Sequence, residues 1–262
     1  MFKTYVFCLL TCVVATTCSP SADEAVAVNY SVFCDGTNSM KNPNDQGWSV
    51  KIDKFEMAVK DLEFTVEGEI HASLLQKISD FIIPSAYAHP GHQAGGEITG
   101  EMTGTFILDI ASGSLKALGE ATLIEGAYHG FNLYFATAST SNGLNANNPL
   151  VGHSIYIEGV AVKENKTINF TAALNEDDGT HMVGGIFNHQ VKEGDIANLN
   201  LRIMDWVELE GMNAPDSIFD GIDFGALDED NDGKVSIEPG QAVHNIMKKE
   251  IAIHDYYYVD AK

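Results

Sequence analysis

Residues 154–174 read SIYIEGVAVKENKTINFTAAL, and this stretch decides the fold class of the chain. Its two apolar runs, residues 154–162 and 167–174, are rich in β-branched and aromatic side chains that alternate with polar ones. The four polar residues between them, Lys-Glu-Asn-Lys, are typical of a tight turn that joins two antiparallel strands. The stretch therefore predicts a β-hairpin.

The same pattern continues on both sides of this hairpin. Upstream, residues 48–66 alternate between polar and apolar side chains with one irregularity, which favours a long strand with a bulge over a helix. Because the predicted strands are evenly spaced, with Gly, Asn and Asp turns and no helices between them, we expect a mainly β chain. The favoured fold is an antiparallel β-sandwich, Ig-like or jelly-roll-like, and a closed barrel is the alternative. Further strands are predicted at residues 98–110, at 118–138 as two strands around Gly126 or Gly130, at 183–187 and at 196–207.

Helical periodicity interrupts the β pattern in two places. Residues 71–83 have helical spacing and end at Pro84, and residues 241–258 have it again near the C-terminus. The predicted organisation is a signal segment at 1–18, a tether and turn-rich lead-in at 19–47, a β-sandwich at 48–210 with a helical or loop insertion near 71–96, and a small C-terminal helical segment at 211–262.

The first eighteen residues are typical of an export signal, because Lys3 precedes a short apolar run over residues 5–14. Cys18 follows this run and resembles the cleavage site of bacterial lipoproteins, although Thr17 stands where that family usually has Gly, Ala or Ser. The resemblance implies lipidation of Cys18 and a place in the bacterial cell envelope, as a periplasmic or outer-membrane lipoprotein; plain secretion is the alternative. No later stretch approaches the ~20 apolar residues of a membrane span, so a lipid anchor is the only membrane attachment expected.

The cysteines leave two arrangements open. Once the signal segment is removed, Cys18 and Cys34 are the cysteines that remain. If Cys18 carries lipid, Cys34 is a lone thiol, and if it does not, a Cys18–Cys34 disulfide can form. Neither arrangement is a disulfide framework or a thiolate metal site.

The charge balance excludes one class of partner. Asp and Glu number 37 against 15 Lys and Arg, and the formal net charge is −22. Phosphate backbones repel such a chain, so nucleic acids are excluded as partners and divalent cations are favoured. No motif indicates a particular protein partner.

An acidic loop near the C-terminus, residues 228–239, reads DEDNDGKVSIEP and resembles the calcium loop of EF-hand proteins. Carboxylates at loop positions 1, 3 and 5 supply hard oxygen ligands, glycine at position 6 makes the sharp turn, position 7 binds through its main-chain carbonyl, and position 9 can bind through water. The resemblance assigns these calcium-binding roles to Asp228, Asp230, Asp232, Lys234 and Ser236.

The end of this acidic loop departs from the EF-hand pattern. Pro239 occupies position 12, where a bidentate Glu is usual, and Glu238 stands one residue earlier. Either Glu238 completes the set of ligands or a carboxylate from elsewhere does. Without bidentate closure we expect weak binding, with a dissociation constant of about 10⁻⁴–10⁻³ M, at a structural site rather than a switch.

Histidines suggest a second metal site. His89 and His92 flank a Pro-Gly turn, and His129 and His153 lie in predicted strands. With carboxylates but no thiolate set, these imidazoles could bind zinc or copper. The segment Tyr-Ala-His-Pro-Gly-His at residues 87–92 is also similar to a loosely defined set of bacterial secreted or lipid-anchored β-sandwich proteins that are regarded as metal-binding.

These features favour an exported, lipid-anchored protein. An enzyme is not expected, since the sequence has no nucleophile elbow, phosphate-binding loop or dinucleotide motif. The preferred function is a calcium-binding β-sandwich protein with a His-based site for capture or delivery of a transition metal. A calcium-stiffened structural or adhesive surface protein is the first alternative. A metal-dependent hydrolase with Glu97 or Glu101 near the metal is the second.

Overall fold

The predicted hairpin is present in the computed structural model, which describes residues 26–37, 43–66, 97–175, 182–203, 217–252 and 256–262. Strand β6 (Ile155–Lys163) pairs antiparallel with β7 (Lys166–Leu174), from Ile155 opposite Leu174 to Lys163 opposite Lys166. Glu164 takes a positive φ of 54° in the turn, which lets the chain reverse within two residues. The hairpin prediction is confirmed.

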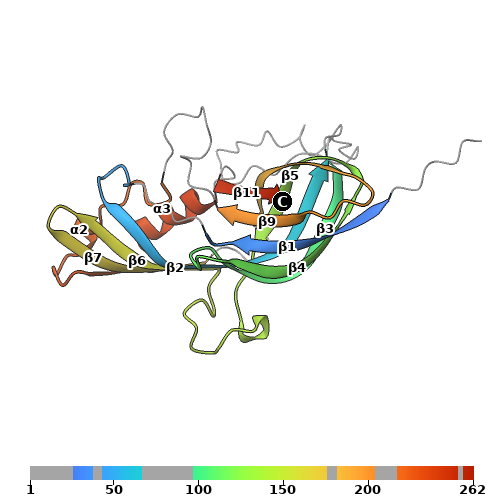
Figure 1. Cartoon of the computed structure of the whole chain (residues 1–262). Coiled ribbons are helices and arrows are strands. Elements are labelled where there is room, and N and C mark those ends of the chain that lie inside the picture. Colours follow the sequence, from blue (N-terminus) through green and yellow to red (C-terminus); the bar gives the residue numbers. More distant parts are fainter. Residues whose placement is uncertain (1–25, 38–42, 67–96, 176–181, 204–216, 253–255) are drawn as a thin grey trace, which may run out of the picture.

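The prediction of a mainly β chain is also confirmed. Strands make up most of the described residues, and helices are short. The other strands are β1 (Ala27–Asp35), β2 (Ser49–Val66), β3 (Glu97–Asp109), β4 (Leu115–Ile124), β5 (Gly126–Phe135), β8 (Met182–Val191), β9 (Asn198–Ile203), β10 (Lys234–Ile237) and β11 (Tyr257–Ala261). The helices are η1 (Thr140–Asn142), α2 (Phe224–Leu227) and α3 (Ala242–Ile251), and η1 lies in a loop that projects from the body (Figure 1).

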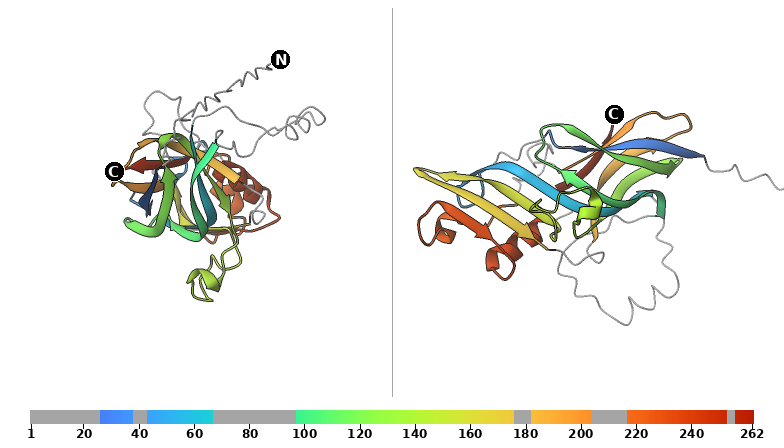
Figure 2. Two further views of the ribbon diagram at one scale, coloured as in Figure 1. Left: turned by 90° about the vertical axis from the view of Figure 1, so that its right-hand side faces the viewer. Right: turned by 90° about the horizontal axis from the view of Figure 1, so that it is seen from below.

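All the described strands belong to one hydrogen-bonded sheet, in the order β10-β7-β6-β2-β3-β4-β1-β9-β11-β8-β5. An additional pairing of β2 with β5 joins this series back on itself, so that the strands from β2 to β5 close into a ring. The remaining strands, β6, β7 and β10, extend from β2 beyond the ring as an arm (Figures 1 and 2). The structure therefore has two parts, a closed ring and an arm that carries α2 and α3.

The strand arrangement differs from the predicted antiparallel sandwich. Within the described residues, β1 pairs parallel with β9, β10 with β7, and β11 with β8, so the sheet is mixed. The Ig-like or jelly-roll-like sandwich is not confirmed, because the strands form one continuous sheet rather than two. Helical periodicity was also misleading at residues 257–258, which lie in β11, while α3 ends at Ile251. The predicted insertion near residues 71–96 and the boundary at 210 lie outside the described residues.

Strand β2 joins the ring to the arm. It has 18 residues, well above the usual five or six. One bulge was predicted, but the pairing with β3 and β6 shifts register at three places, between Ile52 and Lys54, between Lys60 and Leu62, and between Phe64 and Thr65. The second of these shifts lies at Asp61, whose φ is 48°. The Asp61 carboxylate accepts a hydrogen bond from the main-chain N–H of Gly104 on β3 at 3.0 Å, which fixes the bend. The first half of β2 pairs with β6 and the second half with β5, so one strand supplies both parts of the fold.

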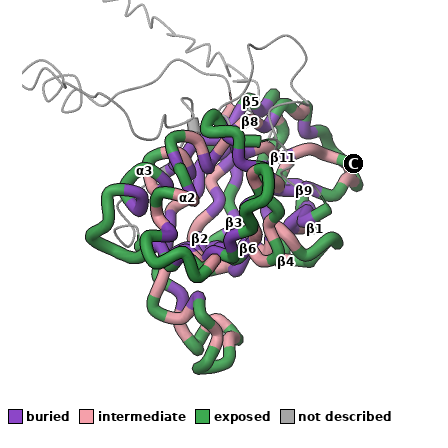
Figure 3. Tube along the Cα trace, turned by 90° about the vertical axis from the view of Figure 1, so that its left-hand side faces the viewer, coloured by how far each residue is buried: buried purple, intermediate pink, exposed green. Residues whose placement is uncertain are grey.

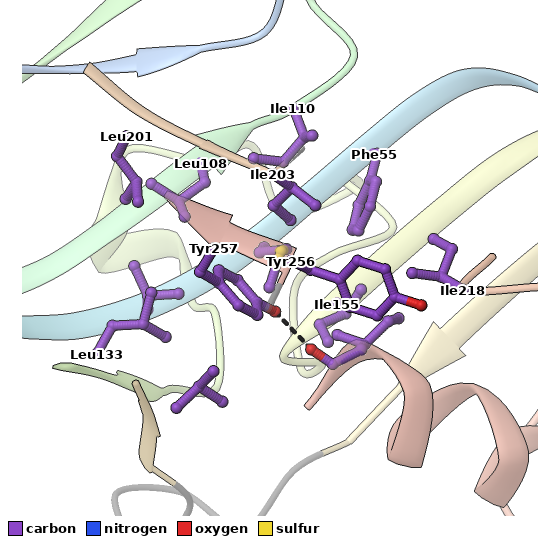
Figure 4. Close-up of a cluster of buried hydrophobic side chains, with 14 of the residues drawn as sticks. Phe55, Leu108, Ile110, Leu133, Ile155, Leu201, Ile203, Ile218, Tyr256 and Tyr257 are labelled. Atoms are coloured by element: carbon purple, nitrogen blue, oxygen red, sulfur yellow. Dashed lines mark hydrogen bonds between the residues drawn. The ribbon is translucent and has the colours of Figure 1, made fainter. Parts of the chain in front are cut away.

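The interior of the ring is filled by aromatic and aliphatic side chains. Phe64 packs against Phe131 and Phe187, with ring centroids 6.3 and 5.3 Å apart, and each of these rings is fully buried. Figure 3 shows buried residues interspersed with exposed ones along the strands, and mostly exposed residues in the projecting loop. Further along the core, the Tyr257 hydroxyl donates a 2.7 Å hydrogen bond to the Ile251 carbonyl, which ties β11 to the end of α3 (Figure 4).

No helix among the described residues combines the length and the apolar character needed to cross a membrane.

Cys34 is a free thiol on β1 with no exposed surface. Burial raises the pKa of this thiol to about 12, because the thiolate would lose its hydration. Its predicted disulfide partner, Cys18, lies outside the described residues.

We expect Cys34 to be unreactive toward a thiol reagent such as DTNB in the folded protein at pH 8, and to react fully in denaturant. Since the folded pKa exceeds the unfolded one, this thiol adds stability below pH ~9 that is lost as the pH rises toward 12. Rapid labelling under native conditions would contradict the burial of Cys34.

Phe170 on β7 is 1% exposed and packs between the rings of Phe219 and Phe224, with centroids 5.5 and 4.8 Å away. Replacing it by alanine should lower the free energy of unfolding by about 3–5 kcal/mol, measured by urea denaturation. Ile196→Ala is the control, because Ile196 is 93% exposed and its loss should change stability by less than about 0.5 kcal/mol. Equal effects of the two changes would contradict this packing.

Candidate metal centre

The acidic loop begins where a one-turn helix ends. Helix α2 is capped at its N-terminus by Asp223, whose side chain accepts from the Gly225 N–H at 3.0 Å. Asp228 ends the helix and is 6% exposed, and its main-chain N–H donates to the Phe224 carbonyl. A turn follows in which Asn231 donates its main-chain N–H to the Asp228 carbonyl with a positive φ of 57°. The chain therefore folds back on itself directly after Asp228.

This reversal brings three carboxylates together. Asp228, Asp230 and Asp232 each offer an oxygen atom, and these atoms lie within 4.8 Å of one another. The group could hold a metal ion, since separations of this size allow several oxygens to contact one cation. Asp228 is buried, while Asp230 and Asp232 are exposed, so an ion could enter from solvent.

Main-chain N–H groups of the same loop orient the three carboxylates. Asp228 accepts from Gly233 at 3.2 Å, Asp230 accepts from the Asp232 N–H at 3.3 Å, and Asp232 accepts from Lys234 at 2.8 Å. Each of these bonds uses an Oδ1 atom, which leaves one oxygen of each carboxylate for another partner. The acidic loop thus positions its carboxylates through its own backbone.

Strand β10 continues from the loop and anchors it to the arm. It pairs parallel with β7, with Lys234 opposite Asn169 and Val235 opposite Phe170. The Asn169 N–H also donates to the Gly233 carbonyl at 2.9 Å. Val235 is 8% exposed and belongs to the main hydrophobic core, which fits the apolar position expected at the eighth residue of the loop.

Glu238 is not part of the group of three aspartates. Its carboxylate accepts a 3.0 Å hydrogen bond from the Ser236 hydroxyl, and its main-chain N–H donates to Gln241 at 2.9 Å. The structure therefore brings together Asp228, Asp230 and Asp232 but not the carboxylate at position 11. The reason is local, because Pro239 and Gly240 turn the chain toward α3 immediately after Glu238.

Carboxylates from two other strands share a pocket with the acidic loop. This pocket has a volume of about 450 Å³, and its acidic lining residues are Asp53, Glu158, Asp230 and Asp232. Asp53 lies on β2 and Glu158 on β6, far from the loop in sequence. Neither residue could be identified from the sequence, since nothing distinguishes them among 37 acidic residues before the strand pairing is known.

A buried aromatic cluster, comprising Trp48, Phe170, Phe219 and Phe224, holds the start of the loop against the arm. Trp48 packs edge-on against Phe224 at 5.9 Å, and its indole N–H donates to the Asp223 carboxylate at 3.1 Å. The position of Asp228, four residues after Phe224, is therefore set by hydrophobic packing.

The buried side chain of Asn44 adds polar contacts to this attachment. Its amide donates to the main-chain carbonyls of Phe219 and Ile222 at 2.9 and 2.8 Å, and its oxygen accepts from the Trp48 N–H at 2.8 Å. The segment before the acidic loop is thus hydrogen-bonded to residues some 175 positions earlier in the chain.

The predicted histidine site lies partly outside the described residues, so it stays a prediction. His89 and His92 lie outside the described residues, as does the lipidation site Cys18. His129 is exposed on β5, and the Nδ1 atom of His153 lies 2.8 Å from the side-chain oxygen of Asn175. Within the described part of the chain, the three aspartates are the only group of three His, Cys, Asp or Glu residues close enough to hold a metal. The predicted site would thus need residues beyond those described.

Comparisons with known proteins found no matching family model, no matching curated protein and no matching solved structure.

Gly233 has a φ of +75°, and a Cβ atom there would lie 3.3 Å from the Thr167 carbonyl oxygen. We expect Gly233→Ala to destabilise the protein by about 1 kcal/mol or more, through backbone strain and this contact. Gly113→Ala is the matched control, because Gly113 has a similar φ of +70° in open space. Thermal unfolding should show the larger loss for Gly233→Ala, and equal losses would contradict the close approach of the loop to β7.

Proposed function

We propose that this chain is an exported calcium-binding protein in which Ca²⁺, held by residues 228–238, stabilises the attachment of the C-terminal segment to the β-sheet. The observation that carries this proposal is the convergence of Asp228, Asp230 and Asp232 at the junction between α2 and β10. The resemblance of residues 228–239 to an EF-hand calcium loop supports the same conclusion.

The donor set favours calcium over other metals. Ca²⁺ prefers six to eight oxygen ligands in a flexible arrangement, whereas zinc and copper favour imidazole and thiolate. Three aspartate carboxylates, the Lys234 carbonyl and water near Ser236 would supply such a shell. Because Glu238 is hydrogen-bonded to Ser236 and stands apart from the aspartates, water would fill the remaining positions, and affinity would be in the range of about 10⁻⁴–10⁻³ M.

A structural role follows from the position of the site. Three like charges held within 4.8 Å repel one another when no cation is present, and this repulsion acts between α2 and β10. Bound calcium would attract all three carboxylates and so outweigh the repulsion among them. At a free concentration of about 100 times its dissociation constant, bound calcium adds about 2.7 kcal/mol to the stability of the fold.

The cellular setting is a further part of the proposal. Residues 1–18 and Cys18 support export and lipid anchoring in a bacterial envelope, where such a low-affinity calcium site would suit an extracellular calcium concentration. Capture or delivery of zinc or copper by His89 and His92, together with His129 or His153, rests on the sequence pattern.

Isothermal titration with Ca²⁺ tests the calcium site. Wild-type protein should bind one ion, and Asp228→Ala should abolish the binding heat. Glu229→Gln is the matched control, because Glu229 carries the same charge beside the site but lies outside the group of three aspartates. A wild-type protein that gives no heat, or a control that loses as much binding as Asp228→Ala, would contradict the proposal.

Thermal unfolding separates calcium binding from a general effect of charge. With chelator present, Asp230→Asn should unfold at the same or a higher temperature than wild type, because it relieves repulsion. With excess calcium it should unfold at a lower temperature, because the bound ion is lost. If Asp230→Asn unfolds below wild type by the same amount in chelator as in calcium, Asp230 acts only as a structural residue.

A further inference from the structure

Three polar side chains from separate elements meet at one point on the inner face of the ring. Tyr30 comes from β1, His189 from β8, and Asp195 from the turn between β8 and β9. The Tyr30 hydroxyl donates to Asp195 Oδ2 at 2.7 Å, and His189 Nε2 lies 2.8 Å from the same oxygen. The Tyr30 hydroxyl and His189 Nε2 are 3.4 Å apart. These three residues are called the Tyr-His-Asp cluster below.

The Tyr-His-Asp cluster is held by its surroundings and open on one side. The His189 ring packs against Tyr30 and Phe187, with centroids 5.9 and 5.8 Å apart. Tyr30 is 1% exposed, whereas the side chains of His189 and Asp195 are 20% and 22% exposed. The Asp195 N–H donates to the Lys192 carbonyl at 3.1 Å, which closes the turn that carries the carboxylate. The three side chains are therefore held in place, and His189 and Asp195 are the two that solvent reaches.

The spacing of these donors matches that of ligands around one metal ion. Oxygen and nitrogen ligands bind a first-row ion at about 2.0–2.2 Å, so two neighbouring ligands in octahedral or tetrahedral geometry lie about 2.8–3.6 Å apart. The three separations in the cluster, 2.7, 2.8 and 3.4 Å, are close to that range. The same three separations are those of hydrogen bonds directed at Asp195 Oδ2, so an ion that binds all three atoms would replace the hydrogen-bonding protons and require the His189 ring to turn its Nε2 lone pair toward the ion.

We propose that Tyr30, His189 and Asp195 form a binding site for an oxidised first-row transition ion, such as Fe³⁺ or Cu²⁺. A phenolate, a carboxylate and one imidazole are hard and borderline ligands, which suit these ions and disfavour Cu⁺. Three protein ligands leave coordination positions open toward solvent. This site shares no residue with the acidic loop, so it is independent of the calcium proposal.

Metal binding at this site releases one proton. The phenolic O–H bond of Tyr30 breaks, its oxygen bonds to the metal, and the proton passes to water. His189 Nε2 gives up the proton that it donates to Asp195 and bonds to the metal, while Nδ1 takes up a proton from water, so the charge of the imidazole is unchanged. Burial, together with the hydrogen bond to Asp195, raises the pKa of Tyr30, so without metal the phenol is protonated. The same hydrogen bond is the largest cause that lowers the pKa of Asp195, which keeps its carboxylate ionised as a ligand.

Titration of the whole protein with Cu²⁺, and separately with Fe³⁺ as its nitrilotriacetate complex, tests the proposal. Coordination by a phenolate produces a visible charge-transfer absorption, which is expected in wild type with at least one of the two ions. Tyr30→Phe should abolish this absorption, and His189→Gln should weaken binding at least tenfold.

Two control variants carry the same chemical changes elsewhere. Tyr156→Phe alters a tyrosine on β6, and His129→Gln alters an exposed histidine on β5, and both should leave the absorption unchanged. Circular dichroism and the calcium titration check that each variant is folded, so a loss of transition-metal binding with calcium binding retained assigns the effect to the cluster.

Absence of the visible band with both ions would overturn the proposal, as would its persistence in Tyr30→Phe. The Tyr-His-Asp cluster would then be a set of structural hydrogen bonds that fixes the turn between β8 and β9. Thermal unfolding would show this structural role directly. Tyr30→Phe would unfold at a lower temperature than wild type, and added metal would change the unfolding temperature of neither protein.

Discussion

The continuous backbone pairing of β2 is the constraint on which the rest of this structure depends. Its first half is hydrogen-bonded to β6 and its second half to β5, while β3 pairs along its other edge. The ring and the arm therefore share one strand. The change of partner lies between Met57 and Val59, a bulge follows at Asp61, and Leu62 and Phe64 beyond it are fully buried. A break in β2 would separate the two parts of the sheet.

The acidic loop depends on the arm in turn. Phe224 sets the end of α2 by packing against Trp48 and Phe170, and β10 fixes the other end of the loop against β7. Hydrophobic burial thus holds three carboxylates at a separation that their charges oppose. A cation bound there would remove the conflict between packing and electrostatics, which is why calcium and fold stability are coupled in the proposed function.

Local sequence patterns predicted what local interactions decide. The hairpin of β6 and β7, the bulged strand β2 and the clustering of Asp228, Asp230 and Asp232 all follow from residues near one another in the chain. A closed arrangement was predicted only as the alternative to a sandwich, because the choice depends on pairings such as that of β1 with β9, which joins residues more than 160 positions apart. The Tyr-His-Asp cluster was missed for the same reason. The predicted C-terminal helix extended to residue 258, although the apolar residues with helical spacing, Val243, Ile246, Met247 and Ile251, all lie within α3.

The order of strands in the ring has a consequence for how the chain reaches its native state. Strand β1 lies between β4 and β9, and β11 lies between β9 and β8. Strands β1, β8 and β9 therefore cannot complete their pairing until segments much later in the sequence have been synthesised. Pairings of this range impose a large loop-closure entropy, and chains rich in them fold slowly. The hairpin of β6 and β7 can form early, but the ring closes only after the segment that contains β11 has been synthesised. Until β11 pairs with β8 and β9, the edges of those two strands stay open, and unpaired strand edges are where chains associate with one another.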